Sequence, residues 1–145
     1  MGSEIPIALR RSGGGIVLHG PEFLNISVVQ KLHKVSIAAA YEPLSSILRP
    51  ALQGLGIEVD FGPVPGAYCD GKYNFRVRGR KLGGTAAIIR TFQGAPYTLA
   101  HVTLHINFGP NQLAAIARVE RALGINKRYD LGMHTAVKNE MTSCR

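Results

Sequence analysis

The chain has 145 residues, 46% of them hydrophobic and 18% charged, a globular composition that excludes a disordered chain. This length supports one domain with its own core, residues 1–145, and leaves little room for a second. No apolar run approaches the roughly 20 residues that span a bilayer, and no basic stretch followed by an apolar one opens the chain. We therefore expect no membrane segment and no signal peptide, which favours the cytoplasm.

The chain is basic, with 17 Lys and Arg against nine Asp and Glu and a net charge of +8. This balance favours an acidic partner, whether nucleic acid, an anionic cofactor or an acidic carrier protein, although a soluble basic enzyme would show it too. The basic residues form no long cluster and the aromatic signatures of RNA binding are missing, which argues against nucleic acid.

The first half of the chain predicts short strands and one helix. Three strands are expected over residues 5–10, 16–19 and 24–31. A helix is expected over residues 42–54, where Leu and Ile recur at three- and four-residue steps before Gly54. Pro50 should kink or split this helix.

The second half predicts a hairpin, a long strand and a helix. A strand begins at residues 57–61, and a loop over residues 62–72 separates it from an alternating strand at 73–78. After a tight turn at Gly79-Arg80, residues 82–92 return as the partner strand, and residues 98–108 form a long strand. The clearest helix covers residues 111–123, with one face formed by Leu113, Ile116, Ala117 and Leu123. A further helix is expected to begin near Val137. The predicted fold class is α+β, one domain with a mostly antiparallel sheet packed with helices.

A glycine run near the N-terminus is the first candidate site, Arg10-Arg11-Ser12-Gly13-Gly14-Gly15. Consecutive glycines let the backbone approach a ligand closely, and their amides can cradle a carbonyl or a phosphate. The flanking arginines would add charge-assisted donors for an anion. A flexible hairpin turn would have the same sequence, so the run alone leaves both interpretations open.

Lys81 and Cys69 are the other candidates. Lys81 is followed by small residues that leave space beside it, as a substrate pocket requires, although a lysine at a hairpin base is usually just solvated. Cys69 lies in a polar glycine loop, and a thiol becomes a nucleophile when a nearby cation holds it as thiolate. A partner histidine is conceivable among His19, His101 and His105.

The cysteine count excludes two other kinds of site. Cys69 and Cys144 are the two cysteines of the chain, too few for a disulfide scaffold, and Cys144 lies beside the C-terminus. No CxxC or Cys/His cluster indicates zinc, so we expect no metal.

In this order, the elements resemble the biotin/lipoate protein ligase and octanoyltransferase superfamily. The lipoate–protein ligase pattern has an Arg- and Gly-rich stretch ending in His, a Gly-x-Lys-[Ile/Leu]-x-Gly-[Ser/Thr]-Ala hairpin, and a strand with a His-Gly-x-Leu core. The similar segments here are residues 11–20, 79–86 and 101–107, and the match runs from about residue 10 to residue 139.

The resemblance implies an acyl pocket walled by the glycine-rich segment and the strand after it, and a central lysine, Lys81, that contacts the acyl carbonyl. The implied substrate-binding residues are Arg11, Gly13, Gly14, Gly15, His19, Gly83, Gly84, Thr85 and His101. His101-Val102 stands in place of the usual His-Gly. Only nine residues precede Arg10, so we expect a shortened or partial catalytic domain that lacks the usual N-terminal segment.

Two features favour transfer over ligation. His19-Gly20-Pro21 is closer to the octanoyltransferase branch than to the His-Asp of ligases. Residues 68–84 are similar to the segment of cysteine-dependent octanoyl amidotransferases in which Cys-Pro-Gly-x-Phe-Asp precedes a strand, a glycine turn and a lysine. The resemblance thus implies Cys69 as the nucleophile and Lys81 as its catalytic partner.

The implied reaction is a double displacement that needs no ATP or metal. Its donor would be an acyl carrier protein or a glycine cleavage H-like protein, and its acceptor a lysine of a lipoyl domain. The alternatives are a lipoate or biotin ligase, which would use ATP and Mg²⁺ to form an acyl-adenylate, and a catalytically silent relative that binds an acyl group or a partner. No nucleic acid or membrane partner is expected.

Overall fold

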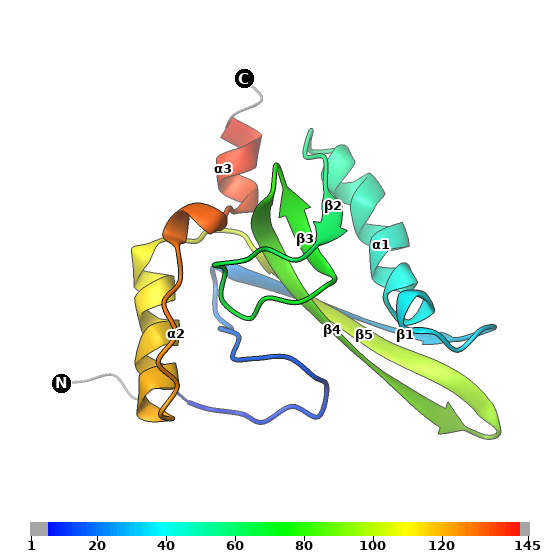
Figure 1. Cartoon of the computed structure of the whole chain (residues 1–145). Helices are drawn as coiled ribbons and strands as arrows, with labels where there is room; N and C mark the ends of the chain where they lie inside the picture. Colours follow the sequence, from blue (N-terminus) through cyan, green and yellow to red (C-terminus); the bar gives the residue numbers. More distant parts are fainter. Residues whose placement is uncertain (1–5, 143–145) are drawn as a thin grey trace.

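The computed structural model describes residues 6–142 and is built on one antiparallel sheet of five strands in the order β1-β5-β4-β3-β2 (Figure 1). The strands are β1 (Phe23–Lys31), β2 (Asp60–Gly62), β3 (Asn74–Val77), β4 (Arg80–Phe92) and β5 (Ala95–His105). The helices are α1 (Ile37–Gln53), α2 (Pro110–Ala122), the 3₁₀ turn η1 (Leu131–Met133) and α3 (Val137–Thr142). The α+β class with an antiparallel sheet is confirmed, and so is the helix near Val137.

The long strand β5 separates the hydrophobic core from the opposite face of the sheet. Side chains alternate between the two faces of a strand, and the Thr98 hydroxyl donates to the Ala40 carbonyl of α1 at 3.1 Å. Ala100, Val102 and Leu104 lie on that same face and pack in the main core with α1. His101, Thr103 and His105 therefore face the other side of the sheet.

Helix α1 is longer than the sequence predicts. It begins at Ile37, where the Ser36 side chain caps it by accepting from the Ala39 N–H at 3.1 Å, and it ends at Gly54 as expected. The expected split at Pro50 is wrong, since the helix runs on to Gln53. Three buried leucines on its sheet-facing side, before and after Pro50, hold both parts against the core: Leu44, Leu48 and Leu52.

Residues 6–10 and 16–19 form no strand, so both predictions are wrong where the structure describes them; Ile5 lies outside the described residues, as does Cys144. Leu9 is 99% exposed, so this apolar run has no sheet edge or core to pack on. Strand β5 covers Ala95–His105 rather than residues 98–108, because Phe108 leaves the sheet for a second core cluster. Ile116 of the predicted α2 face is buried as expected, whereas Leu123 is 62% exposed and Glu120 is buried.

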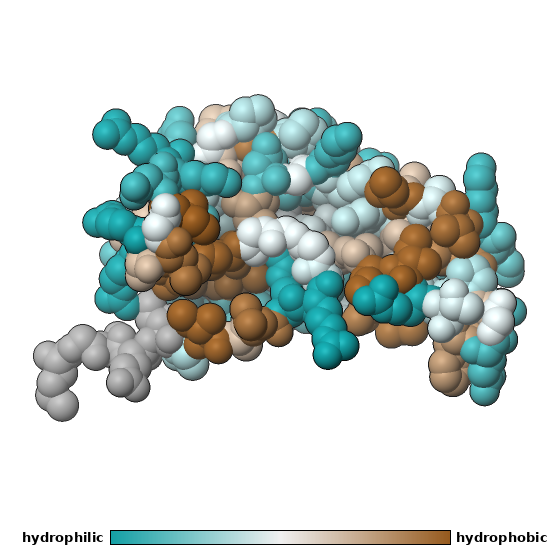
Figure 2. All heavy atoms as spheres, turned by 60° about the horizontal axis from the view of Figure 1, so that its bottom comes forward, coloured by the Kyte–Doolittle hydropathy of each residue, from teal (hydrophilic) through white to brown (hydrophobic). Residues whose placement is uncertain are grey.

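No helix among residues 6–142 combines the length and the apolar character that crossing a membrane would take. The segment before β1 runs across the sheet face opposite α1 (Figure 1). Seen from the side of that segment, hydrophobic side chains gather in two groups with a hydrophilic strip between them (Figure 2).

Candidate active site

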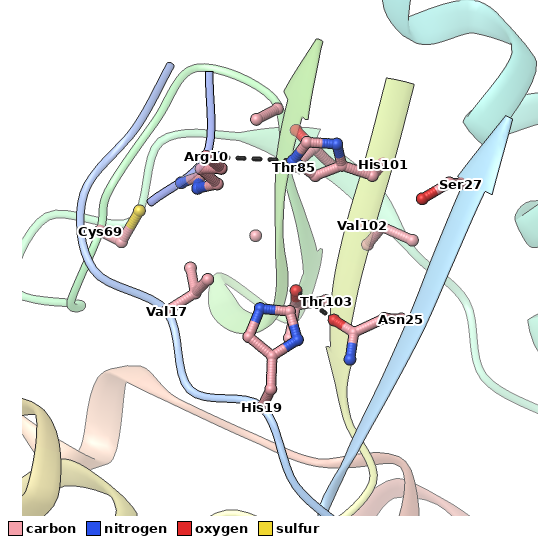
Figure 3. A pocket seen from close by; sticks show the side chains of 12 residues that line it. Arg10, Val17, His19, Asn25, Ser27, Cys69, Thr85, His101, Val102 and Thr103 are labelled. Carbon is pink, nitrogen blue, oxygen red and sulfur yellow. Dashed lines mark hydrogen bonds between the residues drawn. The ribbon is translucent and has the colours of Figure 1, made fainter. Parts of the chain in front are cut away.

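A cavity of about 230 Å³ lies on the sheet face opposite α1, between the strands, the N-terminal segment and the loop after β2 (Figure 3). Its lining combines polar groups with small and apolar ones, and Cys69 contributes the one sulfur among them. The residues that line it are Arg10, Val17, His19, Asn25, Ser27, Cys69, Gly84, Thr85, Ala86, His101, Val102 and Thr103.

Cys69 is a free cysteine in the loop between β2 and β3. Its φ of 43° is in the left-handed region, which residues other than glycine rarely adopt. The thiol points out of the loop toward the N-terminal segment, where its Sγ accepts from the Gly15 N–H at 3.1 Å. A strained backbone of this kind persists only where the surrounding structure holds it.

Lys81 holds the strained turn at Cys69 from its buried side. It is 0% exposed, and its ammonium donates to the carbonyls of Tyr68 at 2.6 Å and of Cys69 at 2.7 Å. Its Nζ also lies 4.5 Å from the centre of the Tyr68 ring. Burial lowers the pKa of Lys81 to about 8, against the charges of Cys69 and Asp70, which raise it. The lysine therefore holds the two carbonyls that define the left-handed turn at the thiol.

The small residue predicted beside Lys81 is Gly84. A Cβ added there would lie 3.3 Å from the Nζ of Lys81. Since Gly84 lines the cavity while Lys81 does not, the glycine leaves the ammonium directly behind the cavity wall. Gly83 has a different role, because a Cβ at this position would lie 2.7 Å from the Thr103 carbonyl oxygen. It permits the close approach of β4 to β5.

The rest of the loop is fixed by side chains at both ends. The Asp70 carboxylate accepts from the Val64 N–H at 2.7 Å and from Nδ2 of Asn74 at 2.8 Å. On the other side, the Tyr68 N–H donates to Nε2 of His134 at 3.2 Å. The thiol thus stands on a loop whose neighbours on both sides are hydrogen-bonded.

A layer of aromatic rings supports Tyr68. The rings of Tyr68 and Phe108 stack at 5.6 Å, and those of Phe108 and His134 at 4.8 Å. His105 bonds the Tyr68 hydroxyl through Nε2 at 2.9 Å and the Thr135 carbonyl through Nδ1 at 3.0 Å. The carbonyl needs a donor, so Nδ1 carries the proton and Nε2 accepts from the tyrosine. Burial lowers the pKa of His105 to about 3, in keeping with this neutral form.

Arg10 closes the cavity from the N-terminal segment. Its guanidinium donates to the carbonyls of Gly13 at 2.6 Å and Gly15 at 3.0 Å, so the glycine run wraps around it. It also contacts Nε2 of His101 at 3.3 Å (dashed in Figure 3), and the Ser12 hydroxyl lies 3.1 Å from the same nitrogen. Arginine only donates, so Nε2 is an acceptor and His101 is neutral. Burial first, and then the charges of Arg10 and His19, lower the pKa of His101.

Gly14 lies between the Arg10 guanidinium and the Cys69 thiol. Its φ of 109° favours glycine, and an added Cβ would lie 2.7 Å from Nη2 of Arg10 and 3.6 Å from Sγ of Cys69. The guanidinium and the thiol therefore flank this glycine. Arg10 is the cation on the open side of Cys69, as Lys81 is on the buried side.

The structure brings together part of the site expected from the sequence. Of those residues, the ones that line the cavity are Cys69, His19, Gly84, Thr85 and His101. Arg11, Gly13, Gly14, Gly15 and Gly83 do not line it, and their part in binding an acyl group stays a prediction. Arg10, the first residue of the glycine-run candidate, also lines the cavity. The residues that the sequence analysis missed include Asn25 and Thr103, which pair across β1 and β5, with the Thr103 hydroxyl donating to Asn25 at 2.7 Å. The alternation of polar and apolar residues along β1 and β5 is the sequence signal that would have placed both on one face of the sheet.

Within residues 6–142, no group of three or more His, Cys, Asp or Glu side chains could hold a metal ion.

Comparison with known families gives a match to the lipoyl protein ligase A/B catalytic domain over residues 2–142. The chain belongs to this family. The family includes lipoate ligases and octanoyltransferases, as the names of its relatives and structural neighbours show.

Two curated relatives illustrate the range. An uncharacterized protein of Cupriavidus necator is 34% identical over 94% of this chain and 60% of its own length. An octanoyl-[GcvH]:protein N-octanoyltransferase of Kyrpidia tusciae is 37% identical over 76% of this chain and 41% of its own length. The chain thus spans about 60% of the length of one relative and 41% of the other.

Solved structures show the same fold. A crystal structure of lipoate-protein ligase A bound with ATP has a TM-score of 0.57 and 19% identity over 92% of this chain and 63% of its own. A T. acidophilum protein with bound lipoic acid has a TM-score of 0.61 and 20% identity over 91% of this chain and 53% of its own. At these identities the likeness concerns the fold.

Proposed function

We propose that this family domain transfers an octanoyl or lipoyl group from a carrier protein to a lysine of a lipoyl domain, through a thioester on Cys69. The observation that carries the proposal is the setting of the thiol. Cys69 lines a cavity of about 230 Å³ on a left-handed turn, accepts from the Gly15 N–H, and has a cation on either side. Reactive cysteines occupy electropositive, partly exposed sites of this kind.

The first step forms the acyl-enzyme. The Cys69 thiolate attacks the carbonyl carbon of the donor thioester or amide, and a C–S bond to the enzyme replaces the bond to the donor. The departing sulfur or nitrogen takes up from the solvent the proton that the Cys69 thiol lost when it formed the thiolate. The Gly15 N–H and the Arg10 guanidinium present positive charge to the sulfur, as a nucleophilic thiolate requires.

The second step regenerates the thiol. The neutral ε-amine of an acceptor lysine attacks the thioester carbon, forms the amide and releases the Cys69 thiolate, while the amine nitrogen loses a proton. Each step passes through a tetrahedral oxyanion, which buried donors stabilise. Lys81 acts as a positioning residue, since its ammonium is engaged with the Tyr68 and Cys69 carbonyls, and its charge lies behind Gly84 at the cavity wall.

The acyl chain occupies the cavity in this proposal. Val17 and Ala86 give it apolar surface, and Gly84 leaves it room beside the strand. The polar side chains Arg10 and His101 are already bonded to each other, which leaves the apolar wall to receive the alkyl chain.

The proposed partners follow from the same chemistry. Relatives named octanoyl-[GcvH]:protein N-octanoyltransferase support a glycine cleavage H-like protein as donor, and an acyl carrier protein is the other candidate. A lipoyl domain is the proposed acceptor. The reaction as written uses no ATP and no metal, because the acyl group arrives already bonded to its carrier.

Intact-mass measurement tests the proposal. The protein is incubated with an octanoylated carrier without ATP, and separately with octanoate, ATP and Mg²⁺. We expect an octanoyl adduct in the first mixture and none with Cys69→Ser. An acyl-adenylate in the second mixture alone would replace the proposal with ligation, and no product in either mixture would leave a binding protein without chemistry.

A further inference from the structure

Cys69 lines a second cavity, of about 250 Å³, besides the one that we assign to the acyl chain. This second cavity lies between the loop after β2 and the segment that follows α2, which run along the same side of the sheet (Figure 1). Its lining residues are Gly66, Ala67, Cys69, Asp70, Lys127, Arg128 and Tyr129. Cys69 is the residue that the two linings have in common.

The wall formed by residues 127–129 is fixed in place. The Tyr129 hydroxyl donates to Oε1 of the buried Glu120 at 2.8 Å, and the Asp130 N–H donates to the Gly66 carbonyl at 2.9 Å. Burial and the neighbouring Glu120 raise the pKa of Tyr129, so its hydroxyl keeps the proton that it donates. The segment is therefore tied to α2 on one side and to the loop of Cys69 on the other.

The charge of this wall is unbalanced. Lys127 and Arg128 are exposed, and neither takes part in an ion pair within the part of the chain that the structure describes. Asp70, the acidic residue of the lining, already accepts hydrogen bonds from Val64 and Asn74 through Oδ1. Two exposed cations at the mouth of a cavity that leads to a thiol attract an acidic partner over several ångströms.

We propose that Lys127 and Arg128 form the docking site for an acidic carrier protein, which reaches Cys69 through this second cavity. The inference rests on the proposed acyl transfer and deepens it. With the acyl chain in the first cavity, the donor group must leave, and the acceptor amine must arrive, from another side of the sulfur. The second cavity offers that side, so donor and acceptor carriers dock in turn at the same two cations.

The test uses two double variants of equal charge change. Lys127→Glu with Arg128→Glu reverses the proposed docking site, and Lys31→Glu with Arg90→Glu reverses two exposed cations on β1 and β4, outside both cavities. Each protein is assayed with an octanoylated acyl carrier protein and with octanoyl-N-acetylcysteamine, a small neutral thioester. Binding of the carrier is measured separately in the Cys69→Ser background, where no transfer takes place.

We expect the docking variant to lose at least about tenfold in kcat/KM and in affinity for the carrier, and to acylate at the wild-type rate with the neutral thioester. The wild-type reaction with the carrier should weaken as salt is added, and that of the docking variant should not. Carrier binding within twofold of wild type, or an equal loss with the neutral thioester, would overturn the docking site. Failure of the proposed transfer is distinct: wild-type Cys69 would then remain unlabelled by either thioester, whatever the binding data show.

Discussion

The two sides of Cys69 differ in how they hold it. On the buried side, Lys81, Tyr68 and His105 lie between the Cys69 loop and the sheet, where they have almost no exposed surface. Each of their side-chain polar groups takes part in a hydrogen bond. On the exposed side, residues 10–15 have no regular secondary structure, and Arg10 is wrapped by carbonyls of its own segment. The difference indicates that the buried side sets the position of the thiol, while the exposed side supplies charge and closes the cavity.

Removing the buried lysine should have the largest effect. Lys81→Met leaves the Tyr68 and Cys69 carbonyls without their donor, and an unsatisfied buried acceptor costs about 1–3 kcal/mol. Release of the turn should slow single-turnover acylation by about 100-fold, as misplacement of a reacting group by about 1 Å does.

The matched control is Lys72→Met, which removes an exposed lysine from the same loop. Thermal melting checks that both variants are folded before acylation by a neutral thioester is timed. Wild-type acylation by folded Lys81→Met would show that the buried side does not position the thiol.

Low pH should reduce the free energy of unfolding, because His105 is buried in its neutral form. Its pKa in the fold is lowered to about 3, whereas an unfolded histidine titrates near 6.5. Below pH 6.5 the unfolded chain binds a proton that the folded chain does not, so stability falls as the pH drops from about 6.5 toward 3. The loss is about 1.4 kcal/mol per pH unit, or about 2 kcal/mol at pH 5.

Urea unfolding at pH 7 and pH 5 measures this loss. His105→Gln should be less stable at pH 7, because it loses the bond to Tyr68, yet its fall between the two pH values should be smaller by about 2 kcal/mol. His33→Gln, at an exposed position, serves as the control. Equal pH dependence in His105→Gln and wild type would mean that His105 is not the group responsible.

The exposed side should show the smallest effect, and one that separates two adjacent arginines. Arg10→Gln removes the guanidinium that flanks Gly14 opposite the thiol, and should slow acylation by about tenfold. Arg11→Gln removes an exposed charge that does not line the cavity and should change the rate less than about twofold. Acylation rates of the two variants at one pH decide the point; equal losses would mean that overall charge, and not position, matters.

The sequence predicted best where local pattern and packing agree. The alternation at residues 73–78 became β3, and the leucine spacing became α1. The early start of α1 at Ile37 depends on the Ser36 side chain, which caps the helix as serine often does at this position. The apolar run before Arg10 was misleading, because strand propensity has no effect without a neighbouring strand to bond.

The site divides in the same way. Resemblance alone linked Cys69 with Lys81, and it did so at the level of spacing; that the lysine bonds the backbone carbonyls depends on the left-handed turn, which no residue pattern announces. Arg10 and Arg11 are adjacent residues of the same type, so the sequence does not tell them apart. The conformation of the glycine run places Arg10, and not Arg11, in the cavity lining. His134 and Thr135 are distant in sequence and contact the site through tertiary structure.

The contacts of His134 and Thr135 tie the C-terminal segment to the loop that carries Cys69. His134 forms a parallel bridge with Lys81, the Thr135 N–H donates to the Lys81 carbonyl at 2.9 Å, and His134 accepts from the Tyr68 N–H. Glu140 adds bonds to Arg80 at 2.8 Å and to Thr135 at 2.5 Å. A chain that ends at α2 would lack the segment that bonds Lys81, Arg80 and the Tyr68 N–H. We therefore expect the loop around Cys69 to reach its final geometry only after residues 134–140 have been synthesised and have packed against it.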